Sequence, residues 1–328
     1  MNAQNTAPET KKQRVIIDTD TGLDDAHAIL YLLAQQDVEV IGITTVFGNC
    51  YVEDSAKNVA TVLKAAGQPH IPIYGGAGEP LQGEASIGWY VHGRDGLGDR
   101  GLERVEPQLQ EESGAEYLVR IANEHPDEVD LLALGPLTNL GLALQQDPQL
   151  LTKFRSVVVM GGAGPYPAPG EAVLVDANTA NDRTAAELVF TLPNAGKLTM
   201  VGVNVTNRAI LDEDALAQLR ALPGPVPQLS AELLDAYNDF YQSKWGRRVS
   251  AAHDGLAAVI LHRPDVVTAT MTGPVDFHRL SEGLATRVAL TADGQPVTSG
   301  TPEGAQIRAV TGFNFAEFRQ LFLAALCV

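Results

Sequence analysis

The sequence Asp18-Thr19-Asp20-Thr21-Gly22-Leu23-Asp24-Asp25 places four carboxylates within eight residues. The preceding Arg14-Val15-Ile16-Ile17 is mostly apolar and β-branched, which is typical of a buried strand. Residues 26–34 have apolar side chains at helical spacing and contain no glycine or proline. The stretch is therefore expected to connect a strand to a helix. In an open α/β sheet, that carboxyl edge is where ligands bind.

The four carboxylates of this turn predict a metal site. So many acids cannot all stay ionised in one pocket without a compensating cation. Oxygen-only ligands in a tight turn favour a hard divalent ion, Ca²⁺ or Mg²⁺, over zinc. The alternative is a capped helix with solvated acids, but a helix cap needs only one carboxylate.

Bulk composition narrows the class of protein. A chain of 328 residues with 45% hydrophobic composition can bury a large core, and we expect a flexible tail over residues 1–13 followed by one catalytic domain over residues 14–328. The net charge of −17 argues against nucleic acid or an anionic membrane as a partner.

Cys50 and Cys327 have no metal-like spacing, and no apolar run is long enough to span a membrane. The tail lacks the apolar core of a signal peptide, so a cytoplasmic enzyme is expected.

Predicted strands and helices alternate from residue 14 to residue 201. Strands are expected at 14–17, 38–46, 71–74, 129–134, 156–160 and 197–201. Helices are expected at 26–34, 55–66, 113–124 and 182–190, and a further helix follows the 135–139 turn and reaches residue 146. This alternation favours an open, mainly parallel α/β sheet with helices on both faces. A C-terminal portion follows, with helices at 212–222, 226–241, 253–261 and 315–325 and short strands at 266–275, 285–291 and 306–310. The Gly-rich, aperiodic stretch from residue 75 to 112 is expected to be a functional or mobile loop.

Five blocks of the sequence together resemble the nucleoside hydrolase family, of the inosine-uridine preferring type. The opening stretch resembles the family signature D-x-D-[PT]-G-x-D-D. The later blocks follow in order as Thr44-Thr45-Val46-Phe47-Gly48-Asn49, Ala133-Leu134-Gly135-Pro136-Leu137-Thr138-Asn139, Val159-Met160-Gly161-Gly162 and His253-Asp254-Gly255-Leu256-Ala257. The likeness continues to Phe315-Ala316-Glu317-Phe318. It implies the open α/β fold of the family and an enzyme that cleaves the N-glycosidic bond of ribonucleosides.

The resemblance also implies a metal site with a set of named ligands. A Ca²⁺ would be held by Asp20, Asp25, Asp254 and the main-chain carbonyl of Leu134. Ligation through a carbonyl explains why an apolar residue can stand at position 134. Asp20 would also be the base that activates a water on the cation.

The resemblance further implies a set of residues that hold the sugar. Asp24 and Asn49 would bind ribose hydroxyls, Asn178 would bind them from the opposite side, and Met160 would line the substrate site. Glycosidic cleavage passes through an oxocarbenium-like sugar, so carboxylates below the ring stabilise the developing positive charge. Hydroxyl contacts fix the position of the ring.

The leaving base needs a proton or an apolar clamp. His253 is the expected acid because it adjoins the ligand Asp254; the alternative is a core histidine before a helix. His92 matches a histidine in a similar H-G-x-x-G-x-G stretch of some members, and the alternative is a surface-loop histidine. Tyr237 and Tyr241 lie i, i+4 on one helix face, where they would either flank the base or only pack.

Two departures from the family pattern concern the 5′ end of the sugar. Members usually carry A-E-F-N, whereas this chain has Val175-Asp176-Ala177-Asn178, with a shorter acid and no aromatic residue. Members also tend to have an asparagine about six residues before that acid, and residues 161–177 contain none. Asp176 is therefore the remaining candidate for the 5′-hydroxyl end. We therefore expect weak discrimination against nucleosides that are deoxygenated or substituted at the 5′ end.

Two other functions compete with nucleoside hydrolysis. Residues 18–22 also resemble the D-x-D-x-[TV] opening of haloacid-dehalogenase-type phosphatases, which use Mg²⁺, a lysine and a late acidic pair. That scheme has no role for Asp24 and Asp25, and the late motif here is His253-Asp254. A non-catalytic nucleoside or sugar binder on the same scaffold is the other alternative. As a hydrolase the chain would take a small nucleoside, with a purine or a pyrimidine base, and would form a homodimer or homotetramer.

Overall fold

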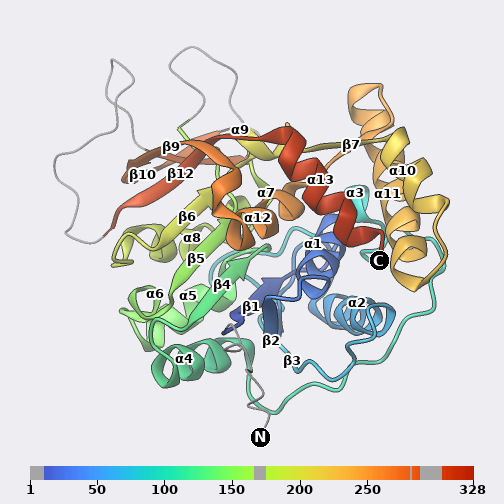
Figure 1. The fold of residues 1–328 in the computed structure, drawn as a ribbon. Helices are drawn as coiled ribbons and strands as arrows, with labels where there is room; N and C mark the ends of the chain where they lie inside the picture. The colour runs from blue at the N-terminus through green and yellow to red at the C-terminus, as the bar shows by residue number, and fades with distance from the viewer. Residues whose placement is uncertain (1–10, 166–174, 281–282, 289–304) are drawn as a thin grey trace, which may run out of the picture.

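The computed structural model describes residues 11–165, 175–280, 283–288 and 305–328, and its centre is an eight-stranded sheet (Figure 1). The strands of this sheet are β1 (Gln13–Thr19), β2 (Val38–Thr45), β3 (Ile73–Tyr74), β4 (Val129–Ala133), β5 (Ser156–Met160), β6 (Leu198–Val201), β9 (Val267–Gly273) and β12 (Ile307–Phe313). Their spatial order is β3-β2-β1-β4-β5-β6-β12-β9. Neighbours from β3 to β12 run parallel, and β9 pairs antiparallel with β12. The predicted mainly parallel sheet is confirmed.

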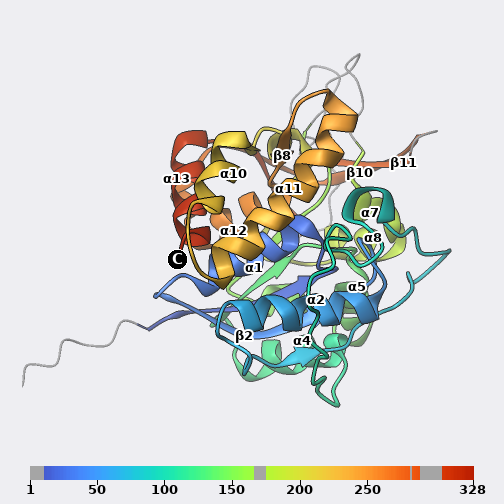
Figure 2. The ribbon, with the colours of Figure 1, turned by 90° about the vertical axis from the view of Figure 1, so that its right-hand side faces the viewer.

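Helices cover both faces of the sheet (Figures 1 and 2). One apolar core contains side chains of α1 (Leu23–Leu33), α2 (Val52–Ala65), α10 (Glu213–Arg220), α11 (Pro225–Trp245), α12 (His253–His262) and α13 (Phe315–Leu326). The other core contains side chains of α4 (Gly114–Glu124), α5 (Thr138–Gln146), α6 (Leu150–Lys153) and α8 (Arg183–Thr191). Figure 1 shows α4 and α5 on the side of the sheet opposite to α12 and α13.

The residues of β1 explain why this strand lies in the middle of the sheet. Val15 and Ile17 belong to one core and Ile16 belongs to the other, because successive side chains of a strand point to opposite faces. All three side chains are fully buried. A strand buried on both faces has a continuous apolar sequence, as this one does.

The smaller elements lie at the carboxyl edge of the sheet and in the C-terminal portion. They are α3 (Trp89–His92), α7 (Ala177–Asn181), α9 (Val203–Thr206), the 3₁₀ helix η1 (Pro264–Val266), the antiparallel pair β7 (Ile210–Asp212) and β8 (Val249–Ala251), and the hairpin β10 (Val275–Leu280) and β11 (Gly283–Val288). None of the helices in the described ranges combines the length and the apolar character needed to cross a membrane.

Several boundaries differ from the sequence prediction for local reasons. The strand expected over 266–275 divides into β9 and β10 at Pro274, which has no N–H for a ladder. The helix expected over 226–241 continues to Trp245, where Gly246 ends it with φ 68°. Residues 1–10 of the expected tail lie outside the described residues. The tail was expected to extend to residue 13, but Gln13 is the first residue of β1 and pairs with Val38.

Candidate active site

The acidic turn after β1 meets the start of α12 at the carboxyl edge of the sheet. Asp24 and Asp25 lie in the first turn of α1, and Asp254 lies in the first turn of α12. One carboxylate oxygen of each lies within 4.8 Å of the others, and all three side chains are buried. The parallel sheet thus brings together acids that are 229 positions apart in the sequence (254 − 25). The arrangement suits a hard cation with oxygen ligands.

Asp20 is linked to this cluster through Asn49, which follows β2. The main-chain N–H of Asn49 donates to Asp20 Oδ2 at 2.7 Å. The side-chain amide of Asn49 donates to Asp20 Oδ1 at 3.1 Å and to Asp25 Oδ2 at 2.8 Å. The group of three acids thus contains Asp24, which the sequence assigned to the sugar, and Asp20 adjoins the group at Asp25.

The electrostatics of the cluster suit a bound cation. Burial, and then the neighbouring Asp25 carboxylate, raises the pKa of Asp24 to about 8. The same two causes raise the pKa of Asp20 well above its ordinary value. Burial, followed by the charges of Asp24, Asp25 and Asp20, does the same for Asp254. Only a cation at this position allows all these acids to ionise together, so the residues present fit a divalent metal.

Leu134, Met160 and Asn178 meet beside the cluster. Leu134 follows β4, Met160 ends β5, and Asn178 lies in α7. The side-chain amide of Asn178 donates to the main-chain carbonyls of Leu134, at 2.5 Å, and Met160, at 3.1 Å. The Leu134 side chain points into the apolar core, so only its carbonyl faces the site. Asn178 was expected in the loop before a helix; the structure places it inside α7.

Asp176 caps α7. Its carboxylate accepts hydrogen bonds from the main-chain N–H groups of Asn178, at 3.0 Å, and Thr179, at 3.1 Å, and from the Thr179 hydroxyl. This is the usual function of an aspartate at a helix N-terminus. The side chain is buried, and its burial raises the pKa of the carboxyl. With these donors around it, Asp176 has little capacity left for a sugar hydroxyl.

His253 lies between two hydroxyl groups at the start of α12. Its Nδ1 shares a hydrogen bond of 2.6 Å with Thr206 of α9, and its Nε2 shares one of 2.7 Å with Tyr241 of α11. Burial, and then the charge of Lys244, lowers the pKa of His253 to about 3. The Tyr237 and Tyr241 rings are 5.0 Å apart. The two buried tyrosines and the half-buried histidine thus form one contiguous group.

His92 is buried, so its reading as a surface-loop histidine is wrong. It ends the short helix α3, which interrupts the expected loop, and only 6% of it is exposed. Its Nδ1 accepts a hydrogen bond of 3.1 Å from the main-chain N–H of Leu23, the first residue of α1. Its ring centroid is 5.8 Å from that of Tyr237. Burial lowers the pKa of His92 to about 4.

The profile of the family described as inosine-uridine preferring nucleoside hydrolase matches residues 15–320. The chain belongs to that family. Uridine nucleosidase 1 of Arabidopsis thaliana is 36% identical over 259 residues, which cover 79% of this chain and 76% of that protein. The pyrimidine-specific ribonucleoside hydrolase RihA of Salmonella enteritidis PT4 is 34% identical over 260 residues, covering 77% and 81% of the two chains.

Solved structures agree with this membership. The plant nucleoside hydrolase PpNRh1 superimposes with a TM-score of 0.87 at 26% identity, covering 96% of this chain and 99% of that one. An inosine-guanosine nucleoside hydrolase superimposes with a TM-score of 0.80 at 25% identity. The chain is a nucleoside hydrolase, a hydrolase of the glycosidase type, and the phosphatase alternative is set aside.

Two site residues of this nucleoside hydrolase were not found from the sequence. Thr206 contacts His253 from the short helix α9, and no sequence motif in that segment points to a site residue. Asn139 lies in one of the blocks that resemble the family, and only that resemblance could have singled it out. Its amide donates to Asp18 Oδ1 at 2.7 Å and to the Thr45 carbonyl at 2.9 Å, which ties β1 to the end of β2. Burial raises the pKa of Asp18 to about 6.

Proposed function

We propose that this chain hydrolyses the N-glycosidic bond of ribonucleosides, giving free base and ribose, in a Ca²⁺-dependent reaction. The observation that carries the proposal is the buried acid cluster of Asp24, Asp25 and Asp254, with the buried His92 and the half-buried His253 beside it. The relatives with 34–36% identity are named for uridine or for pyrimidine ribonucleosides. Uridine is therefore the first substrate to test.

The proposed ligands of the cation are Asp20, Asp25, Asp254 and the carbonyl of Leu134. All of them are oxygen donors, the kind that Ca²⁺ takes. When bound, the cation supplies positive charge and lowers the pKa of a water that it coordinates. Asp20 is the proposed base that takes a proton from the attacking water.

The proposed sugar contacts are Asp24, Asn49 and Asn178. As the bond between C1′ and the base nitrogen breaks, its electron pair goes to the base and positive charge develops on the sugar ring. The water oxygen then forms the new bond to C1′. Buried carboxylates close to the ring stabilise that charge more than solvated ones would, because the surroundings have a low dielectric.

The two histidines have different proposed roles. His253 is the proposed acid for the leaving base: its lowered pKa keeps the ring neutral, so it would give the proton of its ring N–H, and the hydroxyls of Thr206 and Tyr241 beside the two ring nitrogens can each donate or accept a hydrogen bond. The Nδ1 of His92 accepts from the Leu23 N–H, so in the neutral ring the proton resides on Nε2. His92 is therefore proposed as a neutral donor to the substrate.

Further parts of the proposal concern the protein as a whole. We propose one catalytic domain over residues 14–328, a cytoplasmic location, and a homodimer or homotetramer. Neither nucleic acid nor a membrane is a proposed partner, in keeping with the net charge of −17.

Release of reducing sugar, measured with and without a chelator, tests the proposal. The panel contains uridine, inosine and a 5′-modified nucleoside. We expect release that a chelator abolishes and added Ca²⁺ restores. Binding of nucleosides without any sugar release would instead support the non-catalytic binder.

A further inference from the structure

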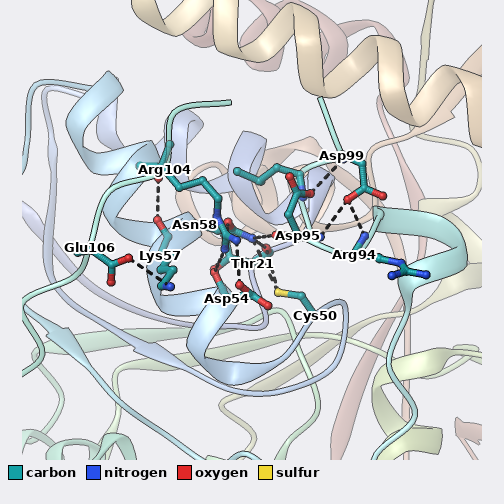
Figure 3. A network of polar contacts seen from close by, with 12 residues as sticks. Thr21, Cys50, Asp54, Lys57, Asn58, Arg94, Asp95, Asp99, Arg104 and Glu106 are labelled. Carbon is teal, nitrogen blue, oxygen red and sulfur yellow. Dashed lines mark hydrogen bonds and ion pairs between the residues drawn. The ribbon is translucent and has the colours of Figure 1, made fainter. Parts of the chain in front are cut away.

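Asn58 of α2 joins two segments of the active site through one side-chain amide (Figure 3). Its Nδ2 donates hydrogen bonds to the main-chain carbonyls of Thr21, at 2.9 Å, and Asp95, at 2.8 Å. Its Oδ1 accepts a hydrogen bond of 3.0 Å from Arg104. The Asn58 side chain is fully buried, and both of its N–H donors are used. No water can take the place of these contacts without rearrangement of the segments.

The first of the two segments is the acidic turn. Thr21 lies next to Asp20, so its carbonyl belongs to the part of the chain that carries the proposed metal ligands. The second segment is the 93–99 loop, which directly follows His92 of α3. Asn58 therefore connects the turn that carries the acids with the loop that follows His92.

The 93–99 loop is closed by its own hydrogen bonds. Asp95 Oδ1 accepts from the N–H groups of Leu97, at 2.7 Å, and Asp99, at 3.0 Å, and Asp99 Oδ1 accepts from the N–H of Asp95 at 3.2 Å. The N–H of Gly98 donates to the carbonyl of His92 at 2.7 Å. A loop closed in this way transmits a displacement of Asp95 to His92.

Two side chains anchor this loop to the body of the protein: Leu97 is fully buried in the apolar core, and Asn58 supplies the buried polar contact through Asp95. At Gly96, which has φ +79°, an added Cβ would lie 2.6 Å from Asn58 Nδ2 and 2.8 Å from Cys50 Sγ. The next charged anchor along the chain is Arg100, which pairs with Asp239 at 2.6 Å and with Asp235 at 3.5 Å, while 28% of its own side chain stays exposed. An exposed ion pair contributes little, whereas a buried amide that loses its partners leaves polar groups unsatisfied.

We propose that Asn58 is a positioning residue: it holds the 93–99 loop against the acidic turn, so that His92 Nδ1 meets the N–H of Leu23. Arg104 orients the Asn58 amide from the other side, and Arg104 is itself held by Asp54 at 2.8 Å. The inference rests on the proposed function, because it requires His92 to act on the nucleoside. Asn58 itself touches no substrate.

The test is a double-mutant cycle between Asn58→Asp and His92→Ala, with kcat and KM measured on uridine. The aspartate has nearly the same shape, but it would present a carboxylate to two carbonyl oxygens. A small misplacement of an active-site group costs about 10²-fold in rate. We expect that loss in kcat/KM for Asn58→Asp, and little further loss when it is added to His92→Ala.

A matched control is Asn194→Asp. Asn194 is also fully buried, and it accepts a hydrogen bond of 2.9 Å from the Gly196 N–H. It precedes β6, so it lies at the amino ends of the parallel strands, whereas the active site lies at their carboxyl ends. We expect wild-type kcat/KM for this control. Hydrogen exchange gives a second readout: exchange of residues 90–100 should accelerate in Asn58→Asp while that of α4 is unchanged. Should Asn58→Asp fail to fold, Arg104→Met enters the same cycle.

Three results would overturn the positioning role. They are wild-type kcat/KM for Asn58→Asp, losses for the two substitutions that multiply in the double variant, and wild-type activity for His92→Ala. Each of these leaves hydrolysis by the wild-type chain intact. Failure of the proposed function looks different, because the wild-type chain would then release no sugar at all.

Discussion

The Nε2 atom of His253 lies 2.7 Å from the hydroxyl oxygen of Tyr241, and this contact joins the start of α12 to the C-terminal part of α11. His253→Ala should slow the hydrolysis of ordinary nucleosides by roughly the 10²–10⁴-fold that is typical of a general acid. A nitrophenyl riboside, whose leaving group needs no proton, should be largely spared. The measurement is kcat/KM on both substrates.

Tyr241→Phe provides the control for that comparison. It removes the hydroxyl but keeps the ring, so it should show a smaller loss with the same preference for the nitrophenyl substrate. Equal losses on both substrates for His253→Ala would assign the histidine a structural role.

Removal of the metal should stop the reaction. Asp25→Ala, Asp254→Ala or a chelator should abolish turnover and release bound calcium, because each removes a ligand or the ion itself. Metal content is measured by elemental analysis alongside activity. Asp20→Ala should lower kcat beyond its effect on metal content, since Asp20 is also the proposed base. An Asp25→Ala variant that keeps full activity and its metal would contradict the ligand assignment.

The 5′-hydroxyl should contribute little to specificity. The Asp176 carboxylate is occupied by donors of α7, and residues 161–177 contain no asparagine. A hydrogen bond to a charged group is worth about 1.5–3 kcal/mol, so its absence here predicts similar kcat/KM for a nucleoside and its 5′-deoxy analogue.

The 2′-deoxy analogue is the internal control for this experiment. It should be a poor substrate, because Asp24, Asn49 and Asn178 are the proposed contacts of the ring hydroxyls. A large penalty for the 5′-deoxy compound would contradict the prediction and direct attention to Tyr166 or Glu171, which lie outside the described residues.

Packing of α12 against α13 should be sensitive to one glycine. A Cβ at Gly255 would overlap the ring of Phe322, so Gly255→Ala should destabilise the fold by about 1–3 kcal/mol. Denaturant unfolding measures the change. In the double variant with Phe322→Leu, the loss should be smaller than the sum of the two single losses. If the loss in the double variant equals the sum of the two single losses, the two side chains do not clash and the helices adjust without strain.

Much of the fold was determined by the sequence itself. The apolar run before Asp18, the helix expected over 113–124 and the regular alternation of strands and helices all specify local structure, and the observed elements confirm them; that helix begins at a capping box of Ser113 and Glu116. Short windows suffice here because strand and helix periods and helix caps depend on neighbours a few residues away. The quoted blocks were likewise sufficient to predict the family, which the profile match confirms.

Only the tertiary structure decided which side chains meet. The burial of His92 against Leu23, the contact of His253 with Thr206 and Tyr241, and the hydrogen bond from Asn178 to Leu134 each join segments from different strands or helices. These contacts depend on the order of strands in the sheet and on how helices cross its edge, and no local period encodes either. The tertiary structure also decided the role of Asp176. Its carboxylate caps the short helix α7, which the sequence did not predict.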